Sequence, residues 1–139
     1  MKPGKVGLIG HSHGGSTTIR STQQVFDLAR RGLRGGIAYY PGCFQQFDRG
    51  VALPLLILIG DKDDWTPAES CRRLQVAGVA RPELVEAVYY PNALHSFDAR
   101  ARERTVPGAP GKVHRLAYDA EAAPDAEARA KAFFEKILR

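Results

Sequence analysis

Three side chains in separate segments of the sequence could together activate a hydroxyl group for attack on a carbonyl carbon. Ser12 lies in the sequence GHSHG at residues 10–14, Asp63 follows a later apolar run, and His95 follows another. A serine hydroxyl is a weak nucleophile at neutral pH, so an imidazole must take its proton as it attacks. A carboxylate must then fix the imidazole tautomer and stabilise its charged form. These residues predict acyl transfer through Ser12, with His95 as base and then acid, oriented by Asp63.

The glycines on both sides of Ser12 predict a sharp turn from a strand into a helix. Residues 6–9 are a short apolar run, and glycine lets the following backbone segments approach closely where a Cβ would clash. We expect the backbone N–H of His13 to contribute to an oxyanion hole. A serine between glycines is also common in a simple tight turn, or at a helix N-terminus that binds an anion.

The elements that must position these residues alternate between strand and helix patterns. This alternation predicts one α/β domain over residues 1–139, with a parallel, doubly wound sheet. Catalytic groups of such sheets collect beyond the carboxyl ends of the strands. Residues 97–111 are expected to form a loop. The expected strands are 6–9, 37–40, 55–59 and 84–90, and the expected helices are 16–31, 66–78 and one from about residue 124 onward.

Thr66 is predicted to start the second of these helices. Pro67 would occupy the first helical position, and Glu69 would complete a capping box with Thr66. These residues therefore have a structural explanation and are not predicted to be catalytic.

Composition and charge exclude several other classes of protein. The chain has 139 residues, of which 44% are hydrophobic and 25% charged, as is ordinary for a globular domain. No apolar run approaches the roughly 20 residues needed to cross a membrane, and no signal peptide is recognisable. The formal charge of +5 is carried by scattered residues, mostly arginine, which argues against a nucleic-acid surface. A cytoplasmic location is the default expectation, with an exported parent protein left open.

Other titratable residues offer alternative assignments. Asp64 could replace Asp63 as the acid, and His114 is the rival base. The pair His11 and His13 could instead ligate a metal ion, which would make the chain a metal-dependent hydrolase. Residues that flank the serine of such a turn point apart, so we expect no metal site and no cofactor.

The two cysteines and three aromatic residues have either structural or functional interpretations. Cys43 and Cys71 could form a disulfide, since both are expected near the same end of the sheet, or they could remain buried thiols. Trp65, Tyr40 and Phe97 could line a substrate pocket or simply pack in the core.

Three motifs resemble the dienelactone hydrolase family of the α/β-hydrolase superfamily. They are GHSHGG at residues 10–15, GDKDDWTP at residues 60–67, and Tyr90-Pro91 followed by His95-Ser96-Phe97. The tail, with Tyr118-Asp119 and Phe133-Phe134, also matches, so the likeness covers essentially the whole chain. The family pattern of a glycine, two residues, the acid and a proline four later selects Asp63. The resemblance implies an α/β-hydrolase fold and a small-molecule substrate.

Two departures from the family pattern modify what the resemblance implies. The family's namesake enzymes have a cysteine nucleophile, so Ser12 favours a general carboxylic-ester or lactone hydrolase. Members also carry an N-terminal half before the first strand seen here, which supplies further strands and the second oxyanion donor. We therefore expect an N-terminally truncated domain, with a catalytically impaired remnant as the alternative function. The strand at residues 6–9 would have an unpaired apolar edge, which favours self-association.

Overall fold

Four parallel strands form the sheet that positions Ser12, Asp63 and His95. The computed structural model describes residues 4–44, 50–76 and 80–139. The strands lie side by side in their order along the chain, and each pairs in parallel with the next. They are β1 (Val6–His11), β2 (Leu33–Tyr39), β3 (Leu55–Gly60) and β4 (Val85–Tyr90).

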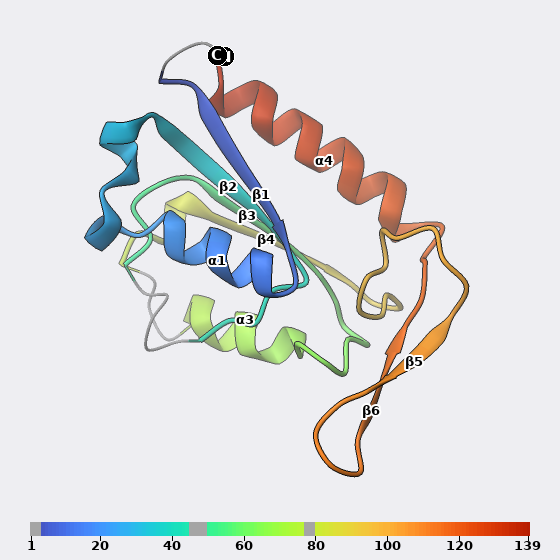
Figure 1. Ribbon diagram of the computed structural model, residues 1–139. Coiled ribbons are helices and arrows are strands. Elements are labelled where there is room, and N and C mark those ends of the chain that lie inside the picture. Colours follow the sequence, from blue (N-terminus) through green and yellow to red (C-terminus); the bar gives the residue numbers. More distant parts are fainter. Residues whose placement is uncertain (1–3, 45–49, 77–79) are drawn as a thin grey trace.

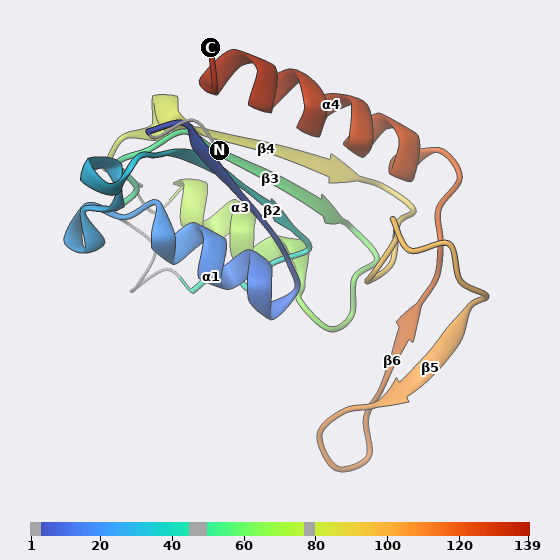
Figure 2. The ribbon, with the colours of Figure 1, turned by 45° about the horizontal axis from the view of Figure 1, so that its top comes forward.

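Helices cover both faces of this sheet, as expected for a doubly wound α/β fold. Helices α1 (His13–Ser21) and α3 (Ala68–Val76) pack on one face, and α4 (Ala122–Ile137) packs on the other (Figures 1 and 2). All six residues of β3 are buried because this inner strand is covered on both sides. Among the described residues, no helix is long and apolar enough to cross a bilayer.

The helix expected over residues 16–31 ends earlier than predicted, so the expectation was wrong for residues 22–31. Helix α1 ends at Ser21, and two short 3-10 turns follow at Gln24–Phe26 and Leu28–Arg31. The backbone N–H of Gln24 donates to Gly50 O at 2.9 Å, and that of Ala52 donates to Thr22 O at 2.9 Å. A distant segment therefore takes over the backbone bonds that would have continued the helix.

The C-terminal part of the chain also differs from the expectation. Part of the expected loop at 97–111 is strand β5 (Arg104–Pro107), which pairs antiparallel with β6 (Val113–Leu116). This hairpin extends beyond the carboxyl ends of the main strands (Figure 2). Helix α4 begins before the expected Pro124, because the Asp119 carboxylate accepts the N–H groups of Glu121 and Ala122 at 3.0 and 2.9 Å.

Helix α3 begins at Ala68, so Thr66 does not form the expected capping box with Glu69. The Thr66 hydroxyl is instead 2.9 Å from the carbonyl oxygen of Tyr40 and 2.9 Å from Asp63 Oδ2. The expected end of the helix at residue 78 lies outside the described residues.

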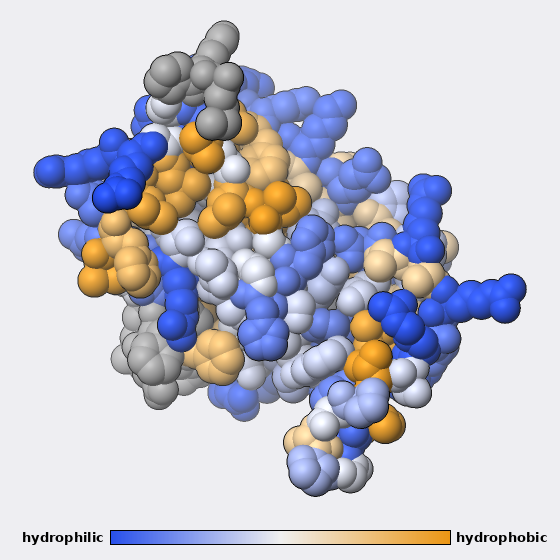
Figure 3. Space-filling model, in the orientation of Figure 1, coloured by the Kyte–Doolittle hydropathy of each residue, from blue (hydrophilic) through white to orange (hydrophobic). Residues whose placement is uncertain are grey.

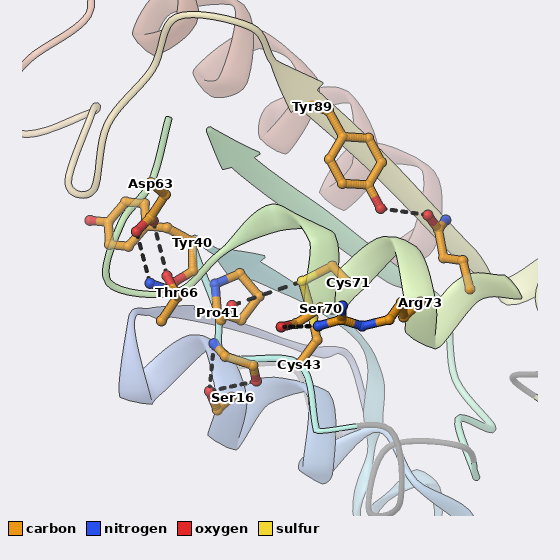
Figure 4. The surroundings of a disulfide bond; sticks show 12 residues. Ser16, Tyr40, Pro41, Cys43, Asp63, Thr66, Ser70, Cys71, Arg73 and Tyr89 are labelled. Carbon is orange, nitrogen blue, oxygen red and sulfur yellow. Dashed lines mark hydrogen bonds between the residues drawn. A yellow bond between two sulfur atoms is a disulfide. The ribbon is translucent and has the colours of Figure 1, made fainter. Parts of the chain in front are cut away.

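A disulfide joins Cys43, in the segment after β2, to Cys71 on α3 (Figure 4). The sulfur of Cys71 also lies 3.9 Å from the carbonyl oxygen of Pro41. The bridge therefore ties the segment that follows β2 to the helix that follows the Asp63 loop.

Reduction of this disulfide is expected to lower the free energy of unfolding by about 3–4 kcal/mol. The two cysteines are 28 residues apart, and opening a loop of this size returns conformational entropy mainly to the unfolded chain. Urea unfolding with and without dithiothreitol measures the change. A C43A/C71A variant serves as the control and should not respond to the reductant. Equal stability of the oxidised and reduced wild type would contradict the prediction.

Strand β1 lies at one edge of the sheet, with β2 as its neighbour. Three of its six residues are partly buried, and Ile9 is 46% exposed. Figure 3 shows apolar side chains gathered over this side of the molecule. In the described sheet β1 thus pairs on one side only, as expected from the sequence, and self-association through its other edge remains a prediction.

Candidate active site

Ser12 lies at the turn between β1 and α1. Strand β1 ends at His11 and α1 begins at His13, so one residue makes the connection. Ser12 has φ 53° and ψ −118°, a conformation that is uncommon for any residue but glycine. Its backbone N–H donates to Tyr39 O at 3.0 Å, which fixes the turn against β2.

A continuous chain of hydrogen bonds runs from Ser12 through His95 to Asp63. His95 Nε2 is 3.1 Å from Ser12 Oγ, and His95 Nδ1 is 2.8 Å from Asp63 Oδ2. The side chains of His95 and Asp63 are 3% and 0% exposed. The structure thus brings together the three residues that sequence analysis placed in one site, at the carboxyl ends of β1, β3 and β4.

The turn after β3 holds the Asp63 carboxylate in place. Asp63 Oδ1 accepts the backbone N–H groups of Trp65 at 2.9 Å and Thr66 at 2.8 Å. Asp63 Oδ2 faces His95 and also lies 2.9 Å from the Thr66 hydroxyl. Buried carboxylates need such partners, because burying an unpaired charge is costly. Both oxygens are therefore satisfied, and the carboxylate can turn away from His95 only by breaking these bonds.

Thr66 contacts both the acid and the histidine, which sequence analysis did not anticipate. Its hydroxyl oxygen is 3.2 Å from His95 Nδ1, in addition to its contacts with Asp63 and Tyr40. Only its place three residues after Asp63, within the same motif, could have indicated this role from sequence.

Replacement of Thr66 by valine is expected to slow the reaction of Ser12 by about ten- to a hundredfold. Valine keeps the shape but removes a hydroxyl, and a lost hydrogen bond to a charged group typically costs about 1.5–3 kcal/mol. The measurement is the rate at which a fluorophosphonate labels Ser12. The T66S variant retains the hydroxyl and should restore most of the rate. A T66V rate equal to that of the wild type would disprove this role.

The other two aspartates of the loop after β3 have partners elsewhere. Asp61 pairs with Arg72 on α3. Asp64 accepts the backbone N–H of Arg115 at 3.2 Å, and its Oδ1 lies 3.3 Å from His114 Nδ1. Asp64 therefore anchors the β5–β6 hairpin to the loop after β3. His114, the rival base, contributes to this anchor through its contact with Asp64.

Two of the three aromatic candidates contact the His95 ring. Tyr40 is buried, with its ring 4.7 Å from the His95 ring, and Trp65 is partly exposed, with its ring 5.1 Å from it. The Trp65 ring also stacks on His114, with centroids 4.8 Å apart. Phe97 is 0% exposed and packs against Tyr40 and Tyr90. Phe97 is thus a core residue in this structure, whereas Trp65 is 39% exposed and its contact with a substrate remains a prediction.

The residues that flank Ser12 have separate environments. His11 Nε2 is 3.0 Å from Asp98 Oδ2, and its ring stacks on Tyr39. His13 is the first residue of α1, so its backbone N–H has no acceptor within the helix and could donate to an oxyanion. Among the described residues, no group of three or more His, Cys, Asp or Glu side chains is arranged to hold a metal ion.

A pocket of about 540 Å³ lies between the start of β4 and the end of α4, the helix that packs on the sheet face opposite α1. Its lining includes Leu56, Val85 and Phe133 but none of Ser12, Asp63 or His95. A smaller pocket of about 210 Å³, lined by His11, Asp98 and Arg100 among others, borders the Ser12 turn. Neither of these two pockets is lined by Ser12, Asp63 or His95.

Comparison with known proteins gives a consistent fold and family. A model of the dienelactone hydrolase family matches residues 1–138. No curated protein has a sequence that matches this chain. A Klebsiella pneumoniae subsp. pneumoniae protein assigned as a dienelactone hydrolase has a similar structure, with a TM-score of 0.74 and 22% identity over 95% of this chain and 52% of its own.

Two further structures show the same fold. A dienelactone hydrolase-like promiscuous phosphotriesterase from metagenomic libraries has a TM-score of 0.69 and 20% identity, over 98% of this chain and 54% of its own. The acylaminoacyl peptidase of Pyrococcus horikoshii has a TM-score of 0.66 and 14% identity, over 99% of this chain and 25% of its own. The chain therefore has an α/β-hydrolase fold and spans about half the length of the dienelactone hydrolase-like structures that it matches.

Proposed function

Because the chain belongs to the dienelactone hydrolase family, we propose that it is a serine hydrolase that cleaves carboxylic esters or lactones. The substrate of this hydrolase is a small molecule, and Ser12 is the nucleophile that attacks it. The observation that supports this proposal most strongly is the unbroken chain of hydrogen bonds from Ser12 Oγ through His95 to the buried Asp63.

The reaction follows from this arrangement in two stages. His95 Nε2 takes the Ser12 proton as the oxygen attacks the carbonyl carbon, and the imidazolium then returns the proton to the leaving alkoxide. A water molecule attacks the resulting acyl-Ser12 ester with His95 again as base, and Ser12 leaves with that proton. Asp63 holds Nδ1–H throughout, and the His13 N–H donates to the oxyanion.

Labelling with a fluorophosphonate tests the nucleophile directly. The Ser12 oxygen would displace fluoride from phosphorus, and peptide mapping by mass spectrometry would locate the adduct. We expect one adduct, on Ser12, that is absent from S12A and retained in S21A, where Ser21 is the last residue of α1 and its exposed hydroxyl donates to Thr17 O. Labelling of S12A at the wild-type rate would refute the proposal.

The alternative function, a catalytically impaired remnant, stays a prediction for this chain, which covers 52% of the Klebsiella structure. Loss of one oxyanion donor costs about 3 kcal/mol, or 100- to 1000-fold in rate. Labelling of Ser12 without measurable ester turnover would identify the remnant, whereas turnover of the acyl-enzyme would identify the hydrolase.

A further inference from the structure

Three of the four described non-glycine residues with positive φ border the Ser12–His95 contact. They are Ser12 at 53°, Tyr40 at 36° and Ser96 at 59°. Such a conformation is unusual for a bulky residue like tyrosine, and the surrounding structure must hold it in place. Tyr40 immediately follows β2, and its backbone N–H donates to Leu58 O at 2.7 Å. This backbone places the Tyr40 ring beside His95.

Tyr40 touches both ends of the histidine–carboxylate pair. Its ring lies edge-on to the His95 ring, with centroids 4.7 Å apart and an interplanar angle of 61°. Its carbonyl oxygen accepts the hydroxyl of Thr66, which is also within 2.9 Å of Asp63 Oδ2. Figure 4 shows Tyr40, Asp63 and Thr66 grouped beside the disulfide. A shift of Tyr40 would therefore disturb the ring of His95 and the support of Asp63 together.

Asp98 joins Tyr40 to the Ser12 turn. Its Oδ1 accepts the Tyr40 hydroxyl at 2.8 Å, and its Oδ2 is 3.0 Å from His11 Nε2. Asp98 lies three residues after His95, and His11 immediately precedes Ser12. One carboxylate thus connects the segment that carries the histidine, the end of β2 and the turn that carries the serine.

The ionisation states of Asp98 and Tyr40 are consistent with the hydrogen bonds that Asp98 accepts. Burial raises the pKa of the Asp98 carboxyl, but hydrogen bonds from His11 and Tyr40 outweigh that effect and leave the pKa lowered. Burial, followed by the hydrogen bond to Asp98, raises the pKa of the Tyr40 hydroxyl. At neutral pH Asp98 is therefore an acceptor on both oxygens and Tyr40 a donor.

We propose that Asp98 is a positioning residue, which holds the His95 ring and the Ser12 turn in mutual register through Tyr40 and His11. This inference rests on the proposed function, since it assigns Asp98 an effect on the reactivity of Ser12. Asp98 touches neither Ser12 Oγ nor the reacting atoms in this arrangement; it acts through its two neighbours. Misplacement of reacting groups by about 1 Å can slow an enzymatic step by about a hundredfold.

The D98N variant tests this role, with D125N as its matched control. Asp125 also accepts a tyrosine hydroxyl, that of Tyr90 at 2.9 Å, and pairs with Arg129, but on α4. We expect D98N to lower the maximal rate of fluorophosphonate labelling of Ser12 by about tenfold. The probe concentration at half-maximal rate should stay unchanged, because positioning affects reactivity rather than binding. D125N should label at the wild-type maximal rate.

A double variant separates positioning from a general loss of stability. Y40F removes only the hydroxyl and keeps the ring beside His95. Because Asp98 acts partly through that hydroxyl, D98N should cost less in a Y40F background than in the wild type. Wild-type labelling by D98N, or equal losses in both backgrounds, would overturn the inference while leaving the proposed function intact. Failure of the wild type to label at Ser12 would overturn both.

Discussion

Replacement of His95 by alanine is expected to lower kcat/KM for ester hydrolysis by about 10⁴- to 10⁶-fold. The His95 ring is the only group that the structure places between Ser12 Oγ and Asp63, at 3.1 and 2.8 Å within the described part of the chain. Without it, the serine proton has no acceptor in position. Hydrolysis of a p-nitrophenyl ester, followed by absorbance, measures the change.

The H114A variant is the matched control for this experiment. His114 lies near the same loop, where it contacts Asp64 and stacks on Trp65, but it makes no contact with Ser12 in the described structure. Its removal should change kcat/KM by less than about tenfold. A larger loss in H114A than in H95A would show that the base had been assigned to the wrong histidine.

Replacement of Gly10 by alanine is expected to destabilise the fold by about 3 kcal/mol or more. A Cβ at this position would overlap the carbonyl group of Gly14 and lie 2.6 Å from Thr18 Oγ1. The obstruction is mainly backbone, which cannot rotate away, so the turn between β1 and α1 would have to open. The free energy of unfolding in urea measures the effect.

The G14A variant provides a matched comparison within the same motif. A Cβ on Gly14 would meet nothing within 4 Å, and Gly14 lies in the first turn of α1. Alanine is favoured over glycine in helices by up to about 1 kcal/mol, so G14A should be neutral or slightly stabilising. Equal destabilisation by G10A and G14A would contradict the packing described for this turn.

Sequence patterns were most informative where a local signal and a buried environment agree. The run at residues 55–59 consists of leucine and isoleucine only, and with Gly60 it forms the fully buried β3. The glycines around Ser12 indicated a close approach of backbone segments, and Gly10 does lie against Gly14. The parallel order of the strands then places the ends of β1, β3 and β4 at one edge, where Ser12, Asp63 and His95 meet. Their catalytic roles remain predictions.

Features set by distant contacts could not be predicted in the same way. Helix α1 stops at Ser21 because residues near 22–24 bond to residues 50–52, which no local pattern reveals. The β5–β6 hairpin lacks a strong alternation of apolar and polar residues, and Asp64 fixes it from outside. The link from Asp98 to His11 and Tyr40 likewise joins three segments that are separate in the sequence.

The formation of an acyl-enzyme is the most direct test of the account. The full chain would be mixed with a p-nitrophenyl ester, quenched in acid and analysed by intact mass and peptide mapping. We predict one acyl group, on Ser12, in the wild type, and a strongly reduced amount in H95A under the same conditions. Acylation elsewhere in the wild type, or equal acylation of Ser12 in H95A, would contradict a serine nucleophile activated by His95.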